Sequence, residues 1–74
     1  MSRQRATVAI GPVPAESLPG VQEALARVPG ILRVYLNAPI EMAYVEYDEE
    51  AVTPPDLLAA IAGVGLHPGE LSRR

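Results

Sequence analysis

The chain contains no cysteine, and this absence removes several kinds of site at once. A disulfide framework, a thiolate zinc site, an iron–sulfur site and a cysteine nucleophile are all excluded. His67 is the one histidine, so a multi-histidine metal site is excluded as well. The 74 residues form at most one small domain with a thin core, and neither disulfide nor thiolate metal can reinforce it.

Lysine, tryptophan and phenylalanine are also missing, and all six basic residues are arginine. Nine acidic residues give a formal charge of -3, which argues against nucleic-acid binding because such proteins need a cationic stripe. Four arginines lie near the chain ends, and we expect them to be solvated tails: Arg3, Arg5, Arg73 and Arg74. The lack of lysine indicates a GC-rich genome, and the single asparagine with eight prolines is compatible with a thermophilic source.

Long apolar runs are absent too. No segment approaches the roughly 20 apolar residues of a membrane span, and residues 6–10 are too short for the apolar part of a secretory signal. The absence of cysteine is compatible with a reducing compartment. We therefore expect a cytoplasmic domain without a membrane span.

The first half of the chain predicts a strand, a helix and a second strand. Residues 1–5 are polar and are expected to be frayed, whereas 7–10 form a β-branched run that stops at a Gly-Pro pair. Apolar residues then recur at helical spacing over 18–28, with Ser17 as the expected N-cap. Strict alternation fails within the next strand, 31–36, which predicts a bulge near Leu32-Arg33.

The second half predicts a strand, a helix and a weak final strand. Residues 42–47 alternate cleanly and form a hairpin with the preceding strand. Thr53-Pro54-Pro55-Asp56 predicts a capped helix start, and Gly65 the end of that helix. Residues 66–71 are interrupted by Pro-Gly and predict a short edge strand.

The resulting order is β-α-β-β-α-β, which predicts a ferredoxin-like α+β sandwich with a four-stranded antiparallel sheet and two helices on one face. We expect a single domain over residues 1–74, with an ordered core of about 6–71. The sheet face that the helices leave open is expected to carry Thr7, Arg33, Tyr35, Tyr44 and Glu46.

Four segments carry a family resemblance: Pro29-Gly30-Ile31, Val34-Tyr35-Leu36-Asn37, Ala43-Tyr44-Val45-Glu46-Tyr47-Asp48 and Gly65-Leu66. With their spacing, residues 11–65 resemble the heavy-metal-associated domain of copper chaperones and metal-transporting ATPases. The resemblance implies a ferredoxin-like fold. It also implies that a soft ion such as Cu(I) would be bound by two cysteine thiolates on the loop before the first helix.

The chain departs from that family at the metal loop. Counting back from the helix places the two cysteine positions on Pro14 and Ser17, and counting forward from the first strand places them on Ala15 and Leu18. Pro12 or Val13 replaces the family's methionine. No thiol is present in either register, and a serine hydroxyl is a hard ligand that stays protonated at neutral pH, so the resemblance implies a degenerate site.

Other residues offer weaker candidates for a site. His67 is expected near the former metal loop, where it is either a surface histidine or a remnant ligand. Met1 and Met42 are soft donors, but packing or exposure is the expected role, with Met42 placed away from the loop or at an edge. An acidic cluster is expected to be a solvated turn, or else a docking surface for a basic partner: Glu46, Asp48, Glu49 and Glu50.

Tyr35 and Tyr44 are expected to be neighbours on the open sheet face. Such a pair either stabilises the hairpin alone or takes part in dimer or partner binding. Two hypotheses follow. The first is a non-catalytic protein-interaction or regulatory module without a cofactor, whose partner is a second copy or a metal-handling protein. The alternative is heavy-metal binding through non-thiol ligands such as His67, shared across a dimer.

Overall fold

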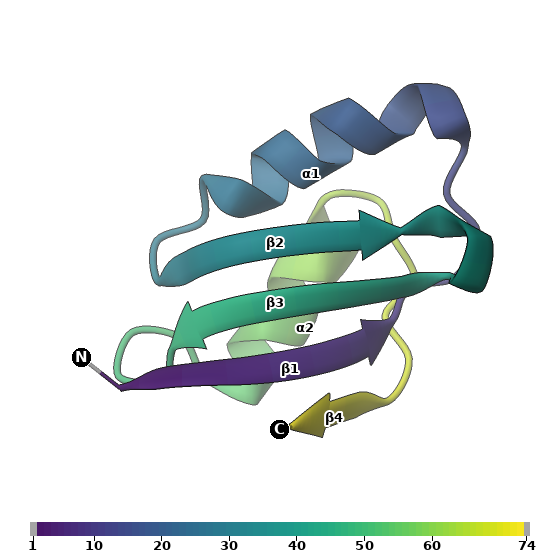
Figure 1. Cartoon of the computed structure of the whole chain (residues 1–74). Coiled ribbons are helices and arrows are strands. Elements are labelled where there is room, and N and C mark those ends of the chain that lie inside the picture. The colour runs from purple at the N-terminus through teal and green to yellow at the C-terminus, as the bar shows by residue number, and fades with distance from the viewer. Residues whose placement is uncertain (1, 74) are drawn as a thin grey trace.

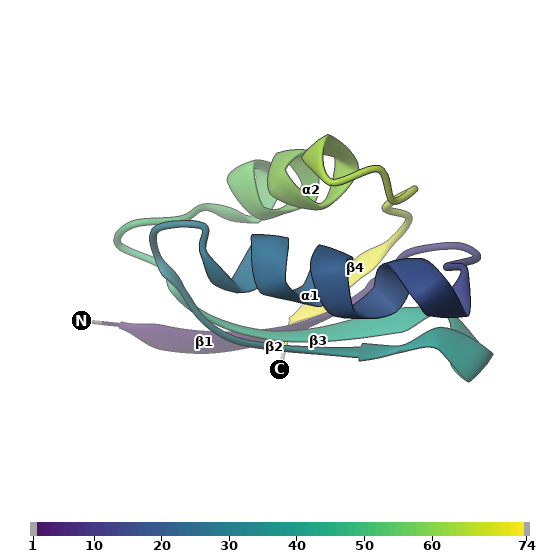
Figure 2. The same ribbon diagram turned by 90° about the horizontal axis from the view of Figure 1, so that it is seen from above.

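The computed structural model describes residues 2–73, and its elements follow the predicted order (Figure 1). Their bounds are β1 Arg3–Ala9, the 3-10 turn η1 Ala15–Ser17, α1 Leu18–Ala26, β2 Ile31–Asn37, the 3-10 turn η2 Ala38–Ile40, β3 Met42–Asp48, α2 Pro54–Gly63 and β4 Leu71–Arg73. The strands form one antiparallel sheet in the order β2-β3-β1-β4. Figure 2 shows both helices on one side of this sheet, and the predicted ferredoxin-like fold is confirmed.

The first strand is longer than the sequence suggested. Residues 3–5, which we expected to be frayed, pair with 46–48 of β3. Arg3 and Arg5 are therefore strand residues and not solvated tails, and their Nε atoms each lie 3.7 Å from a carboxylate oxygen of Glu46. The prediction was wrong because it relied on apolar residues, whereas opposite charges on neighbouring strands also favour pairing.

The last strand begins later than predicted. Residues 66–70 reach the sheet edge as irregular chain, in which the His67 N–H donates to the Ile10 carbonyl at 3.0 Å. Pro68 follows and has no N–H to donate, so a regular ladder cannot form there. The regular strand is confined to Leu71–Arg73.

The core lies between the helices and the covered sheet face. The alternation of β3 and the register shift of β2 between Ile31 and Arg33 are both confirmed. The largest fully buried side chains come from β1 and the residue after it, from β3 and from both helices: Val8, Ile10, Leu25, Tyr47, Leu57 and Ile61. The hydroxyl of Tyr47 has no hydrogen-bond partner among the described residues, although the side chain is 0% exposed.

The two helices begin differently. The predicted capping box of α2 is confirmed, since the Asp56 N–H donates to Thr53 Oγ1 at 3.3 Å and the Thr53 N–H to Asp56 Oδ2 at 3.2 Å. Ser17 stands at the N-cap position of α1, but its side chain makes no capping bond. Its backbone is already helical because η1 runs directly into α1, so the extended geometry of a serine cap is absent.

Helix α1 lies along β2, which is one edge of the sheet (Figure 1). The side chain of Gln22 reaches from the helix to this strand, and its Oε1 accepts the Leu36 backbone N–H at 3.2 Å. The helix thus satisfies one backbone donor that the edge strand would otherwise leave to water.

Candidate functional site

The loop that would carry the two thiolates joins β1 to α1. Pro14 is exposed, and its carbonyl accepts the Ser17 N–H at 3.0 Å, which closes the 3-10 turn η1. Ala15 is exposed as well, whereas Leu18 packs against the hydrophobic core. One register offers a pyrrolidine ring and a hydroxyl, and the other a methyl group and a partly buried apolar side chain, so neither donor set fits a soft ion.

His67 lies beside this loop, as expected. A Cβ added to Gly11, whose φ is +74°, would lie 3.4 Å from the His67 Cβ and 3.8 Å from its Cδ2. These are ordinary van der Waals distances, so the two segments lie in contact, and it is the positive φ that favours glycine at this position. The imidazole is exposed and makes no hydrogen bond with the described residues, so it is accessible at the position where the family resemblance places the metal loop.

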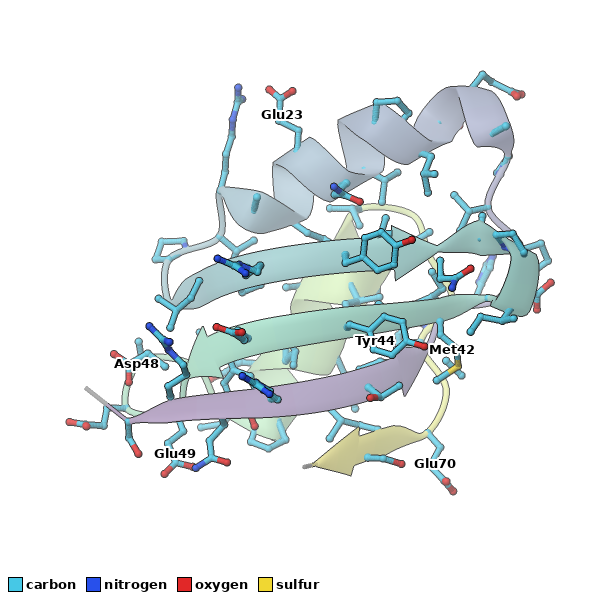
Figure 3. All side chains as sticks on the ribbon, viewed as in Figure 1. Glu23, Met42, Tyr44, Asp48, Glu49 and Glu70 are labelled. Atoms are coloured by element: carbon cyan, nitrogen blue, oxygen red, sulfur yellow. The ribbon has the colours of Figure 1, made fainter. Side chains whose placement is uncertain are left out.

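Met42 is not where the sequence analysis placed it. It pairs with Ala9, the last residue of β1, and therefore lies at the sheet end from which the loop departs. Figure 3 shows it at the start of β3, on the same strand as Tyr44. The error arose because the pairing of β1 with β3 was not considered when Met42 was placed. Met1 lies outside the described residues.

The acidic cluster does not converge on one point. Among residues 2–73, no group of three or more His, Cys, Asp or Glu side chains could hold a metal ion. Asp48 accepts the backbone N–H groups of Glu50 at 3.0 Å and Ser2 at 3.2 Å, and these bonds hold the pKa of its carboxyl below the ordinary value. Ser2 also donates through its hydroxyl to Glu49 Oε1 at 2.8 Å, so this turn fastens the start of β1.

The open sheet face is organised in rows of side chains that run across the strands. One row is Arg33–Glu46–Arg5, and the next is Tyr35–Tyr44–Thr7. The predicted tyrosine neighbours are confirmed, since their ring centroids lie 6.1 Å apart at an interplanar angle of 25°. Tyr35 is 57% exposed and Tyr44 38%.

A shallow hollow of about 360 Å³ lies between these two rows. The charged row and the tyrosine row form its sides, and β1 and β3 form its floor: Arg5, Ala6, Thr7, Arg33, Tyr35, Tyr44, Val45 and Glu46. The sequence analysis placed most of these residues on the open face but missed Arg5. The signal was the alternation of Arg3 and Arg5 opposite two carboxylates, which indicates a strand that faces water.

Several solved structures share the fold of this chain. Oxidized MerP from Ralstonia metallidurans CH34 matches with a TM-score of 0.81 and 22% identity, over 92% of this chain and 96% of that one. The N-terminal domain of a potential copper-translocating P-type ATPase from Bacillus subtilis, in the Cu(I)-loaded state, matches with a TM-score of 0.77 and 20% identity, over 97% and 91%. This chain has the heavy-metal-associated fold.

The mercury-bound form of MerP, described as the periplasmic protein of the bacterial mercury detoxification system, matches with a TM-score of 0.71 and 26% identity over 99% of both chains. No family model matches the chain, and no curated protein does either. The heavy-metal-associated fold is therefore present over nearly the whole chain, without any cysteine. Within residues 2–73, neither helix has the length and apolarity to span a bilayer.

Proposed function

We propose that the chain is a non-catalytic protein-interaction module of a metal-handling system, and that it associates through the open face of its sheet with a second copy or another protein of that system. One observation carries the proposal. Two of the exposed large apolar side chains, Tyr35 and Tyr44, are stacked side by side on the open face of the sheet. Aromatic side chains are enriched at protein interfaces.

The loop between β1 and α1 supports this proposal because it lacks the thiolates that would bind a metal ion. Matching structures are described as mercury-bound or Cu(I)-loaded, but neither candidate pair of positions here can supply a thiolate. The Ser17 hydroxyl has no hydrogen-bond partner among the described residues that could activate it, so the proposal assigns this serine no role as a nucleophile. Because the loop has no thiolates, we assign binding to the surface of the domain, and in particular to the open face of the sheet.

Self-association can be measured by sedimentation velocity over a wide range of protein concentration. We expect a concentration-dependent dimer that is weakened by Tyr35→Ala. Ile40→Ala is the matched control, since Ile40 is 55% exposed but lies on η2 and does not line the hollow. A monomer at every concentration, with no change in any variant, would refute association through this face.

A second function is favoured by the contact between His67 and Gly11, which places an exposed imidazole at the former metal loop. In this alternative, heavy-metal binding uses non-thiol ligands, with His67 from each copy of a dimer. Titration with Cu(I), Zn(II) and Ni(II) against a competing chelator tests it, with His67→Ala alongside. Stoichiometric metal binding that is lost in His67→Ala would support this alternative and contradict the interaction module.

A further inference from the structure

Arg33 has no bonding partner among the described residues. The side chain of Glu46, the cross-strand partner of Arg33 on β3, forms ion pairs with Arg3 and Arg5 instead. No hydrogen bond or ion pair joins the Arg33 side chain to another of the described residues. An exposed guanidinium presents a planar fork of donors that matches carboxylate and phosphate oxygens. A free anion-binding group is therefore available on the open sheet face.

The stacked tyrosines lie directly beside this guanidinium. Arg33 and Tyr35 are two residues apart on β2 and share one face, and Tyr44 is the cross-strand partner of Tyr35. An aromatic ring offers an apolar surface against which another planar ring can stack. The charged group and the aromatic surface line the same hollow.

The size of the hollow limits what can enter it. Its volume is about 360 Å³, whereas an apolar cavity of about 150 Å³ already takes benzene. One aromatic ring with a single anionic substituent therefore fits, and the open side of the hollow leaves the remainder of a larger ligand in water.

We propose that the hollow between the Arg33–Glu46–Arg5 row and the Tyr35–Tyr44–Thr7 row binds an aromatic anion. The ring packs against the tyrosines, and its carboxylate or phosphate accepts hydrogen bonds from Arg33, with Arg5 as a second donor. No covalent step is involved.

The charge distribution supports an anion at this place and disfavours a long nucleic acid. The chain carries a formal charge of -3, yet the open face has three arginines, Arg3, Arg5 and Arg33, against two carboxylates. Of these two, Glu46 lines the hollow, whereas Asp48 is at the far end of β3. Elsewhere the acidic surface repels anions, so a polyanion would meet repulsion beyond the hollow. A ligand with one or two charges remains within the favourable region.

Glu46 is expected to weaken anion binding in the hollow. Its carboxylate holds Arg5 and Arg3 and also repels an incoming anion. Glu46→Gln removes the repulsion and releases Arg5 for the ligand. Binding of an aromatic anion should therefore become tighter in Glu46→Gln, by about threefold or more.

The test is a titration of the ¹⁵N-labelled full chain, followed by amide chemical shifts. Phenyl phosphate and phenylacetate are the two anionic probes, benzyl alcohol supplies the ring without charge, and inorganic phosphate the charge without a ring. We expect one anionic probe or both to bind with a dissociation constant of about 1 mM or below. The shifts should centre on Arg33, Tyr35 and Tyr44. The stronger of the two probes identifies whether phosphate or carboxylate is preferred.

Two variants and one control complete the test. Arg33→Gln and Tyr44→Ala should each weaken binding about fivefold to tenfold. Arg27→Gln is the matched control, because Arg27 follows α1 and pairs with Glu23, away from the hollow. It should leave binding unchanged.

The proposal is overturned if benzyl alcohol or phosphate alone binds as tightly as the aromatic anions, or if no probe binds. Loss of affinity in Glu46→Gln, or equal effects of Arg27→Gln and Arg33→Gln, would also overturn it. The experiment contains no second protein, and probe binding is measured at a concentration where the chain is monomeric. Its outcome is therefore separate from that of the self-association test.

Discussion

The buried hydroxyl of Tyr47 provides a direct test of the core. The side chain is 0% exposed, and the hydroxyl oxygen has no partner within residues 2–73. Burying a polar group without a hydrogen bond costs about 1–3 kcal/mol. Tyr47→Phe removes that cost and leaves only the small gap of one oxygen atom, which forfeits a few dispersion contacts. We expect a net gain in the free energy of unfolding of about 1 kcal/mol.

Urea and thermal unfolding of the purified chain measure this change. In a domain of this size, 1 kcal/mol shifts the melting temperature by roughly 4–8 °C. Tyr35→Phe is the matched control, since that hydroxyl is on an exposed side chain, and its effect should stay within about 0.5 kcal/mol. Destabilisation of Tyr47→Phe by about 1 kcal/mol or more would refute the reasoning, because it would show that the hydroxyl is hydrogen-bonded in solution.

Three further substitutions, with Gly20→Ala as the comparison for the first, test local structure. Gly30→Ala places a Cβ against Val52 at a φ of +92° and should lower the free energy of unfolding by about 2–4 kcal/mol, measured by chemical denaturation. Gly20→Ala, at an exposed position of α1, should raise it by about 0.5–1 kcal/mol. Equal effects of the two substitutions would contradict the clash at Gly30. Thr53→Ala removes the capping box of α2 and should cost about 1 kcal/mol by the same assay, and an unchanged midpoint would contradict it. The pKa of Asp48 is lowered by backbone N–H donors. Its stabilising effect is therefore present above the ordinary pKa of an aspartate and is lost as pH falls through the lowered value. Acid titration of unfolding should show a shallower loss for Asp48→Asn than for the unmodified chain, and identical slopes would exclude this contribution.

Much of the fold was predictable because its signals are local. The alternation of 42–47, the capping box at Thr53 and the failed alternation near Arg33 each involve a few neighbouring residues, and all three features are present. Apolar residues mark such elements directly, since each must bury one face. The strand 3–5 was missed because its pairing depends on charges of β3, which lie some forty residues away along the chain.

The site was predictable only in part. Tyr35 and Tyr44 were placed together because a short hairpin fixes their register. Met42 was misplaced, and Arg5 was not recognised as a neighbour of Arg33, since both positions depend on the pairing of β1 with β3. That pairing joins segments about forty residues apart. Its signal, the alternation of Arg3 and Arg5 with two carboxylates of β3, is visible only when the two segments are compared.

The bond from Gln22 to the backbone of β2 bears on the behaviour of the protein at high concentration. β2 has seven residues and is an edge strand of the sheet. Edge strands are templates to which another chain can add a strand. Gln22 accepts the Leu36 N–H, so this backbone donor of β2 is not available to an added strand. Gln22 thus leaves one fewer donor of β2 open to strand addition, and we expect Gln22→Ala to raise the tendency to aggregate through this edge at high concentration.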